Sequence, residues 1–238
     1  MAHAVVSHDE WVEARKKHLA EEKKFTRLRD ELSAARRELP WELVEKEYVF
    51  EGPHGSKTLG ELFEGRSQLV IYHAMFNPET ASDRTSWTED AACQACSFWM
   101  DNFERIVIHL NHRDITMAAV SMAPVAAIEA YRRRMGWTFE WYSALPSDFN
   151  YDYNVSFRPG QKRGVYNYVE GEVGGSESPG VSVFLKEGDR IFHTYSTYTR
   201  GLDMLNVAYH YMDLVAKGRD EGERNGMFWL RRRDEYTD

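Results

Sequence analysis

Cysteine is scarce in this chain of 238 residues, which holds only Cys93 and Cys96. Two cysteines are too few for a secreted domain held together by disulfides. In a reducing compartment, a close cysteine pair is more often catalytic or metal-binding than structural. The count therefore excludes a disulfide scaffold, and we expect a cytoplasmic protein.

Long apolar runs and excess positive charge are also lacking. No stretch approaches the ~18 apolar residues of a membrane span, and residues 1–10 have no apolar signal-peptide core. The net charge of -8 and the pI near 5.6 oppose binding to nucleic acid or an anionic membrane. We expect neither partner. The hydrophobic content of 42% is sufficient for a sizeable core.

The two cysteines that are present form a Cys-Gln-Ala-Cys motif, residues 93–96, ahead of an apolar-periodic stretch. Two thiols at this spacing can close a small ring, so that Cys93 attacks a substrate and Cys96 resolves the mixed disulfide. Backbone N–H groups at a helix start favour a thiolate and lower its pKa. The same spacing also serves zinc and occurs by chance in helices.

The order of the predicted elements places this motif in a fold. We expect a long helix over residues 8–39, ended by Pro40, and a loop at the glycine-rich stretch 171–180. The remaining predicted elements are strand 47–51, helix 59–63, strand 69–72, helix 96–110, strand 115–121, helix 124–134, a hairpin of 181–186 with 190–195, and helix 202–216. Alternating strands and helices predict a parallel sheet whose ligands gather at the strand C-termini, where the cysteines follow strand 69–72.

The start of the motif helix decides how reactive Cys93 is. Residues 86–89, Ser-Trp-Thr-Glu, form a capping-box pattern, and a helix beginning there would place Cys93 a turn inside it. Glu89 and Asp90 also carry like charge that disfavours a thiolate. Our hypothesis is that the helix restarts at Cys93.

Two other functions compete with redox chemistry. A zinc site would combine the cysteines with histidines, but His109 lies ~20 Å from Cys96 if the helix is continuous; His54, His73 and His193 remain candidates. A binding module would use the aromatic cluster at residues 137–168, although aromatics mostly pack in cores. We expect no metal and no cofactor.

Several further segments carry a resemblance to known families. The Cys-x-x-Cys motif at a helix start, Pro179 before a hairpin and a closing helix together resemble the thioredoxin superfamily. The runs 93–99, 132–137, 147–152 and 192–198 resemble the bacterial DUF899 family over nearly the whole chain. Residues 137–157 are similar to the extra segment of peroxiredoxin-type members.

This resemblance implies a fold, a chemistry and a set of site residues. The fold is an α/β, thioredoxin-like, peroxiredoxin-related sheet flanked by helices. The activity is thiol-disulfide exchange on a protein or small-molecule disulfide or peroxide, with Cys93 as nucleophile and Cys96 as resolving thiol. Pro179 matches the cis-proline of the superfamily, although a trans turn proline is the commoner case, and it would contact substrate together with Gln94 and Ala95. The alternative is a non-catalytic binding or redox-sensing module.

The expected organisation has three parts. Residues 1–40 form a helical arm, residues 41–218 form the thioredoxin-like domain with an insertion at about 137–180, and residues 219–238 form a tail. The seven-residue spacing that Trp11, Phe25 and Leu32 share suits a helix packed across its own domain as well as a dimerisation arm, and we expect a homodimer. The mixed charges of tail residues 231–236 predict intrachain pairing or a subunit contact.

Overall fold

A computed structural model describes residues 3–82, 85–222 and 226–237. The chain divides into two compact units, residues 1–40 and 41–238. The first unit is dominated by α1 (His8–Arg37), which Ser7 and Glu10 open with a capping box. No helix in the described ranges has the length and apolar character needed to cross a membrane.

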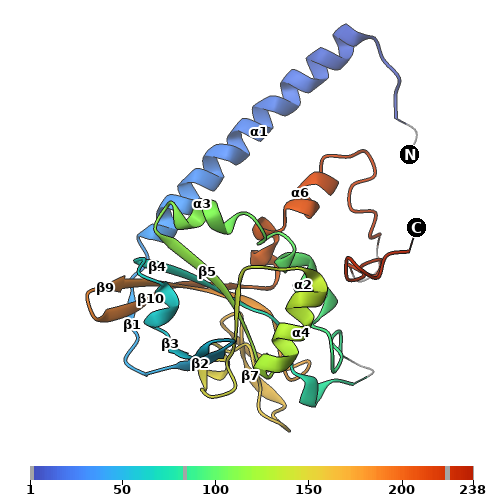
Figure 1. Cartoon of the computed structure of the whole chain (residues 1–238). Coiled ribbons are helices and arrows are strands. Elements are labelled where there is room, and N and C mark those ends of the chain that lie inside the picture. The colour runs from blue at the N-terminus through green and yellow to red at the C-terminus, as the bar shows by residue number, and fades with distance from the viewer. Residues whose placement is uncertain (1–2, 83–84, 223–225, 238) are drawn as a thin grey trace. The chain divides into compact units, whose positions relative to one another are not determined.

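The second unit is built on an eight-stranded sheet, coloured from blue to orange in Figure 1. Its order is β1-β10-β9-β4-β5-β6-β2-β3, and β4, β5 and β6 are parallel. The strands of this sheet are β1 (Glu42–Leu43), β2 (Val49–Gly52), β3 (Gly55–Thr58), β4 (Gln68–His73), β5 (Ile115–Ser121), β6 (Glu140–Ser143), β9 (Gly180–Glu187) and β10 (Arg190–Tyr198).

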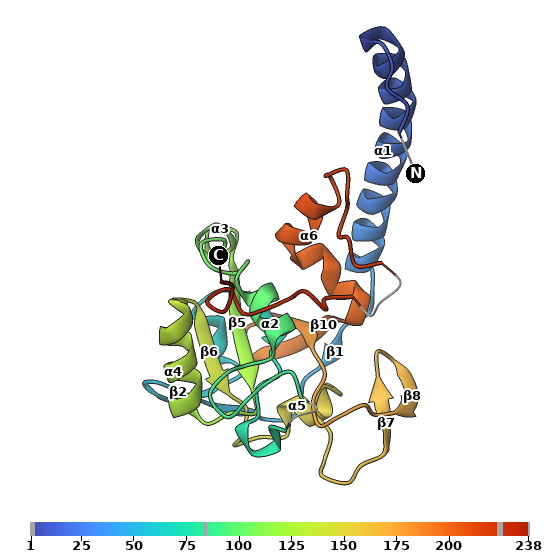
Figure 2. The ribbon, with the colours of Figure 1, turned by 90° about the vertical axis from the view of Figure 1, so that its right-hand side faces the viewer.

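The helices of the second unit cover the sheet or connect its strands. They are η1 (Glu61–Phe63), η2 (Pro78–Thr80), α2 (Gln94–Met100), α3 (Val107–Asn111), α4 (Val125–Met135), α5 (Phe149–Asp152), η3 (Thr199–Leu205) and α6 (Val207–Met212). A separate hairpin of β7 (Arg163–Tyr166) and β8 (Val169–Glu172) stands apart from the main sheet in Figure 2. The α/β architecture expected from the sequence, a sheet flanked by helices with a long N-terminal helix, is confirmed.

Two hydrophobic cores lie on the two faces of the sheet because strand side chains alternate. In β5, Met117 and Ala119 face the core that holds α2 and α4, whereas Ala118 and Val120 face the other core. The first core carries the cysteines and contains Trp99, Tyr131 and Trp137. The aromatic cluster at 137–168 is therefore mainly core, with Trp141 in the first core and Phe149 in the second.

Most predicted elements are present with shifted ends. The hairpin of β9 and β10 and strand β5 are confirmed, and Gly136 ends α4 in a left-handed conformation (φ 63°). The predicted continuous helix 96–110 is wrong: α2 stops at Met100, and Arg105 (φ 74°) turns the chain before α3. The Asn102 side chain donates to the Phe98 carbonyl and accepts from the Val207 N–H, which stabilises this break.

The segment 137–180 is not uniformly an excursion from the sheet. Its first strand, β6, pairs in parallel with β5 and belongs to the central sheet. The closing helix expected over 202–216 is shorter, since η3 occupies its start and α6 ends at Met212. The tail expected at 219–238 includes residues 223–225 and 238, which lie outside the described residues.

Candidate functional site

The two cysteines lie where the chain re-enters the fold after leaving β4. Cys93 is the N-cap of α2, and its extended backbone (φ -49°, ψ 134°) marks the helix start. The predicted restart of the helix at Cys93 is confirmed, and the capping-box pattern at residues 86–89 opens no helix. Asp90 instead accepts a hydrogen bond from the Thr88 hydroxyl on the exposed side of this loop.

A single residue that follows β4, Met75, forms hydrogen bonds to both cysteines. The Met75 carbonyl accepts from the Cys93 N–H at 3.0 Å, and the Met75 N–H donates to the Cys96 Sγ at 3.3 Å. The Ser86 carbonyl accepts from the Gln94 N–H at 3.2 Å. These backbone bonds fix the dithiol at the C-terminal end of β4, the ligand-binding edge expected of a parallel sheet.

Both thiols are reduced and deeply buried. Neither cysteine is in a disulfide, and each residue is 1% exposed. A buried thiol resists ionisation unless donors surround it, because burial penalises the charged form. The hydrogen-bond partners of each sulfur therefore decide which of them carries the charge.

Donors converge on Cys93. The Cys96 thiol donates to its sulfur, the Ser86 Oγ donates at 2.9 Å, and the backbone N–H groups of Cys96 and Ala95 point to it. The hydrogen bond from Cys96, followed by those from Ser86 and the backbone, lowers the pKa of Cys93 against the opposing effect of burial. Cys93 is thus the sulfur that ionises.

Cys96 has the opposite electrostatic environment. Burial first, and then the neighbouring Cys93 thiolate, raise the pKa of Cys96. The Tyr72 hydroxyl and the Met75 N–H oppose this rise without overcoming it. Two interacting thiols titrate as a pair, and here the first proton is lost from Cys93. The two sulfurs thus differ in the direction in which their pKa values are shifted.

A buried carboxyl that the sequence did not single out lies near Cys93. Glu177 is 7% exposed, and one of its carboxyl oxygens has no hydrogen-bond partner. The Phe76 N–H donates to the carboxyl, and the Ser156 hydroxyl approaches it at 3.5 Å. Burial raises the pKa of Glu177 to about 8, and the nearby Cys93 adds to the rise. The carboxyl is neutral at pH 7.

Sequence reasoning missed Glu177 because it belongs to the glycine-rich stretch read as a loop. Residues 176–178 are instead anchored to residues 155–157: Phe157 N–H donates to the Ser176 carbonyl, and Ser178 N–H donates to the Val155 carbonyl, both at 2.8 Å. Its position two residues before Pro179 was the only available signal.

The C-terminal tail covers the loop before Cys93. The Arg232 guanidinium, in a residue only 6% exposed, donates to the Ala92 carbonyl at 2.8 and 3.0 Å and to the Ser86 carbonyl at 3.2 Å. Glu235 balances its charge, and Asp234 pairs with Arg134 of α4. The predicted intrachain pairing of the tail is confirmed.

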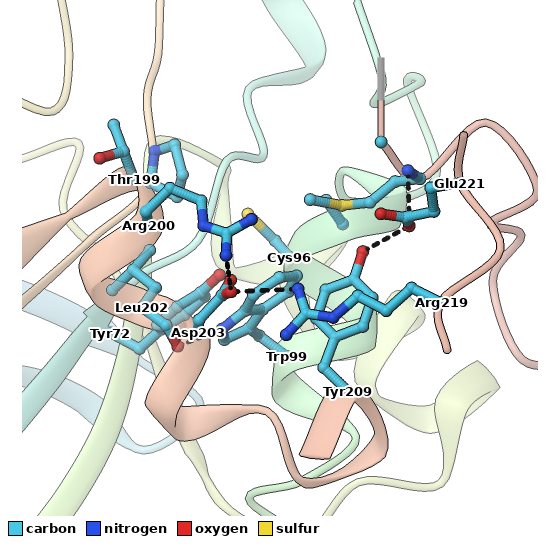
Figure 3. Close-up of a pocket in the computed structure, with 14 residues that line it drawn as sticks. Tyr72, Cys96, Trp99, Thr199, Arg200, Leu202, Asp203, Tyr209, Arg219 and Glu221 are labelled. Atoms are coloured by element: carbon cyan, nitrogen blue, oxygen red, sulfur yellow. Dashed lines mark hydrogen bonds and ion pairs between the residues drawn. The ribbon is translucent and has the colours of Figure 1, made fainter. Parts of the chain in front are cut away.

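A pocket of about 330 Å³ opens beside Cys96, and Figure 3 shows residues that line it. Tyr72, Trp99 and Tyr209 form aromatic walls around Cys96, and Arg200, Asp203 and Arg219 lie nearby. The predicted substrate-contact residues Ala95 and Pro179 also line it. Cys93 and Gln94 are absent from its described lining.

The expected cis form of Pro179 is wrong, since no cis peptide bond occurs in the described ranges. The trans segment is held in another way, because the Pro179 carbonyl accepts a hydrogen bond from the Tyr166 hydroxyl at 2.7 Å. Pro179 still reaches the pocket that contains Cys96.

Two of the histidines considered for zinc, His73 and His193, make hydrogen bonds elsewhere in the fold. His73 is buried between Asn150 (Nδ1 to Oδ1, 3.0 Å) and Ser182 (Nε2 to Oγ, 2.9 Å), and burial lowers its pKa to about 4. His193 contacts Ser196 and Glu42. Within residues 3–82, 85–222 and 226–237, no group of three or more His, Cys, Asp or Glu side chains is placed to hold a metal.

Comparison with solved structures gives peroxiredoxin-type neighbours. Peroxiredoxin Q from Xanthomonas campestris is 13% identical, with 71% of this chain and 93% of that chain covered and a TM-score of 0.48. Peroxidoxin BcpB from Mycobacterium tuberculosis is 9% identical (71% and 94% covered, TM-score 0.44). The mitochondrial 2-Cys peroxiredoxin from Plasmodium falciparum is 11% identical (71% and 90% covered, TM-score 0.40).

Comparison of the sequence itself gives a family. No curated protein matches the chain. The sequence profile of DUF899, described as a bacterial protein of unknown function, matches residues 1–236. That match spans the arm, the sheet, both cysteines and the tail residues that cover them, so this chain belongs to the DUF899 family.

Proposed function

We propose that this protein is a thiol-disulfide oxidoreductase in which Cys93 is the nucleophile and Cys96 the resolving thiol. The observation that carries this proposal is the difference between the two sulfurs: donors lower the pKa of Cys93, while burial and the Cys93 thiolate raise that of Cys96. Thiolates rather than thiols are nucleophilic, so the pair has one attacking and one reserve sulfur.

With a disulfide substrate, the Cys93 thiolate attacks one sulfur and the other leaves as a thiolate that takes up a proton. Cys96 then loses its proton and attacks the Cys93 sulfur of the mixed disulfide, which releases the second thiol. With a peroxide, Cys93 attacks one oxygen, the alcohol or water leaves, and Cys96 expels water from the sulfenic acid. Two electrons pass to the substrate, and a Cys93–Cys96 disulfide remains.

Glu177 fits this scheme as the proton source. Its carboxyl is neutral below about pH 8 and lies near Cys93, where the departing thiolate or alkoxide needs a proton. A general acid is most effective when its pKa is near the operating pH. Ala95, Pro179 and Gln94 are proposed to contact the substrate around the dithiol.

The test compares the wild type with Cys93→Ser and Cys96→Ser for reduction of insulin, of a small disulfide and of hydrogen peroxide. We expect Cys93→Ser to lose activity entirely, and Cys96→Ser to accumulate a mixed disulfide or sulfenic acid on Cys93 that mass spectrometry detects. Ser147→Ala is the matched control, because the Ser147 hydroxyl has no hydrogen-bond partner. Equal activity in all four proteins would favour a binding or sensing module instead.

We also propose that the protein is a cytoplasmic homodimer. Two unpaired thiols suit a reducing compartment. In α1, Trp11, Phe25, Leu28 and Leu32 form an apolar seam that a lone helix cannot bury. Sedimentation equilibrium of the full chain and of the double variant Phe25→Glu, Leu32→Glu tests this: we expect a dimer and a monomer respectively. A monomeric wild type would refute the proposed homodimer.

A further inference from the structure

The pocket presents one sulfur of the dithiol and not the other. Cys96 lines the 330 Å³ cavity together with Tyr72 and Trp99, whereas Cys93 does not line it. Around Cys93 lie Ser86 and the loop whose carbonyls Arg232 holds. A molecule bound in the pocket therefore meets Cys96 first.

The chemistry of disulfide cleavage selects the same sulfur. When a thiolate attacks a disulfide, the sulfur that leaves faster is the one whose thiol has the lower pKa. The donors around Cys93 stabilise it as a departing thiolate. Attack on a Cys93–Cys96 disulfide is thus favoured at Cys96, with Cys93 as the leaving group. Geometry and leaving-group chemistry agree.

We propose that this pocket binds a small apolar or aromatic thiol that regenerates the enzyme by attacking Cys96. The proposal rests on the proposed function, since it requires a Cys93–Cys96 disulfide. The incoming thiolate forms a bond to the Cys96 sulfur as the Cys93–Cys96 bond breaks, and Cys93 leaves as a thiolate. A second thiol molecule then attacks the sulfur of the first molecule, which is bound to Cys96. The bond to Cys96 breaks, and a small disulfide leaves. The Cys96 thiolate takes up the proton that the second thiol gave up.

The walls of the pocket define the ligand class. Trp99 and Tyr209 pack edge to face with ring centroids 5.7 Å apart, and the Trp99 Nε1 donates to the Leu202 carbonyl, so the walls offer mainly apolar surface. A volume of about 330 Å³ is near the lower limit of small-molecule sites. The ligand is therefore compact, and a folded protein reductant is too large to enter.

The charges of the pocket are largely paired with one another. Asp203 accepts from Arg200 at 2.8 Å and from Arg219 at 3.1 Å, and Arg219 also bonds Asp213 at 2.7 Å while its guanidinium stacks 3.9 Å from the centre of the Tyr209 ring. Glu221 accepts from the Tyr209 hydroxyl and the Trp229 Nε1. An anionic ligand would have to break these pairs, so an uncharged thiol body is favoured.

The experiment starts from the oxidised wild type and follows its reduction by benzyl mercaptan and by mercaptoethanesulfonate at equal thiolate concentration. We expect at least tenfold faster reduction by benzyl mercaptan. Acid quenching followed by tandem mass spectrometry should locate the transient benzyl adduct on Cys96. An adduct on Cys93, or equal rates for the two thiols, would overturn the proposal.

A blocked pocket provides the second arm. Ala95→Phe places a ring in the pocket that Ala95 lines, while Ala130→Phe adds the same ring on the exposed side of α4 and serves as control. We expect the disulfide of Ala95→Phe to be reduced by benzyl mercaptan at least tenfold more slowly than that of the wild type, and that of Ala130→Phe to be reduced at the wild-type rate. Reduction of Ala95→Phe at the wild-type rate would refute the assignment of this pocket as the thiol-binding site.

The two proposals fail in distinguishable ways. If no Cys93–Cys96 disulfide forms under any oxidant, the proposed function fails before the pocket is tested. If the disulfide forms and turns over but Ala95→Phe has no effect, only the pocket assignment fails. A variant that does not fold is recognised by its far-UV circular dichroism, and Ala95→Leu then replaces Ala95→Phe with the same expected direction.

Discussion

Ser86 contributes a hydroxyl to the thiolate of Cys93, with the Oγ 2.9 Å from the sulfur. We expect Ser86→Ala to raise the pKa of Cys93, because a hydrogen bond to a charged group is worth about 1.5–3 kcal/mol. That energy corresponds to a rise of about one to two units. The rate of alkylation by iodoacetamide as a function of pH measures it.

The wild-type profile should have its midpoint below the ~8.5 of an ordinary cysteine. Ser147→Ala is the control for the loss of a hydroxyl elsewhere. An unchanged midpoint in Ser86→Ala would show that the backbone donors and Cys96 suffice to hold the thiolate.

Glu177 should matter most when the leaving group is poor. Glu177→Gln removes the proton donor near Cys93, so reduction of a dialkyl disulfide should slow by about a hundredfold, the lower end of the range for general acids. Reduction of an aromatic disulfide, whose thiolate leaves without a proton, should change little. Stopped-flow kinetics with both substrates measures the contrast, and Glu172→Gln, exposed on β8, is the control.

A uniform loss on both substrates would assign Glu177 a structural role. The aromatic disulfide isolates the attack by Cys93, because its leaving thiolate needs no proton from Glu177.

At the scale of elements, Arg232 fastens the tail to the loop that precedes α2. We expect Arg232→Met to destabilise the fold by about 2–4 kcal/mol, since the Ser86 and Ala92 carbonyls lose a charged donor. Cys93 should then be alkylated faster at fixed pH. Chemical unfolding and iodoacetamide kinetics measure the two effects.

Arg231→Met is the matched control, because Arg231 is exposed and its NH1 donates only to the neighbouring Leu230 carbonyl. A loss of stability without faster alkylation would show that the tail supports the fold but does not limit access to Cys93.

The elements that the sequence predicted well are those with local signals. Strand β5 is a run of apolar residues with predicted bounds equal to the observed ones, and α4 is delimited by Pro124 and Gly136. The break after α2 has no such signal, because it depends on the Asn102 side chain meeting Val207, 105 residues away along the chain. The helical spacing of apolar residues continues across the break, so the sequence predicts one continuous helix.

The site was predictable only in its local part. Cys93 and Cys96 share a motif, and their position follows from the strand before them. Glu177 and Arg232 reach the same place from 84 and 139 residues beyond Cys93, so tertiary structure alone brings them there. The cis form expected of Pro179 failed because proline restricts φ but leaves the isomer to its surroundings.

For the whole molecule, two buried groups titrate in opposite senses. Burial lowers the pKa of His73 to about 4 from 6.5, so the folded state binds fewer protons than the unfolded state between these values, and stability rises with pH there. Burial raises the pKa of Glu177 to about 8 from 4.5, so stability falls as pH rises through that range.

We therefore expect Glu177→Gln to lose less stability than the wild type between pH 6.5 and pH 8. Between pH 4.5 and pH 6.5 the two groups offset each other in the wild type, so His73→Gln should lose stability there as the pH rises. Urea unfolding at half-unit pH steps measures both. His18→Gln, exposed on α1, is the control for His73. If both variants keep the wild-type pH profile, other groups govern the pH dependence.

The backbone of Met75 has a consequence for dynamics, because this one residue contacts both cysteines. Its carbonyl bonds the Cys93 backbone, and its amide bonds the sulfur of Cys96. When Cys96 enters a disulfide, that sulfur turns from the Met75 amide toward Cys93, and the amide proton loses its acceptor. Hydrogen exchange at this single amide should therefore accelerate on oxidation, which makes Met75 a built-in reporter of the redox state of the protein.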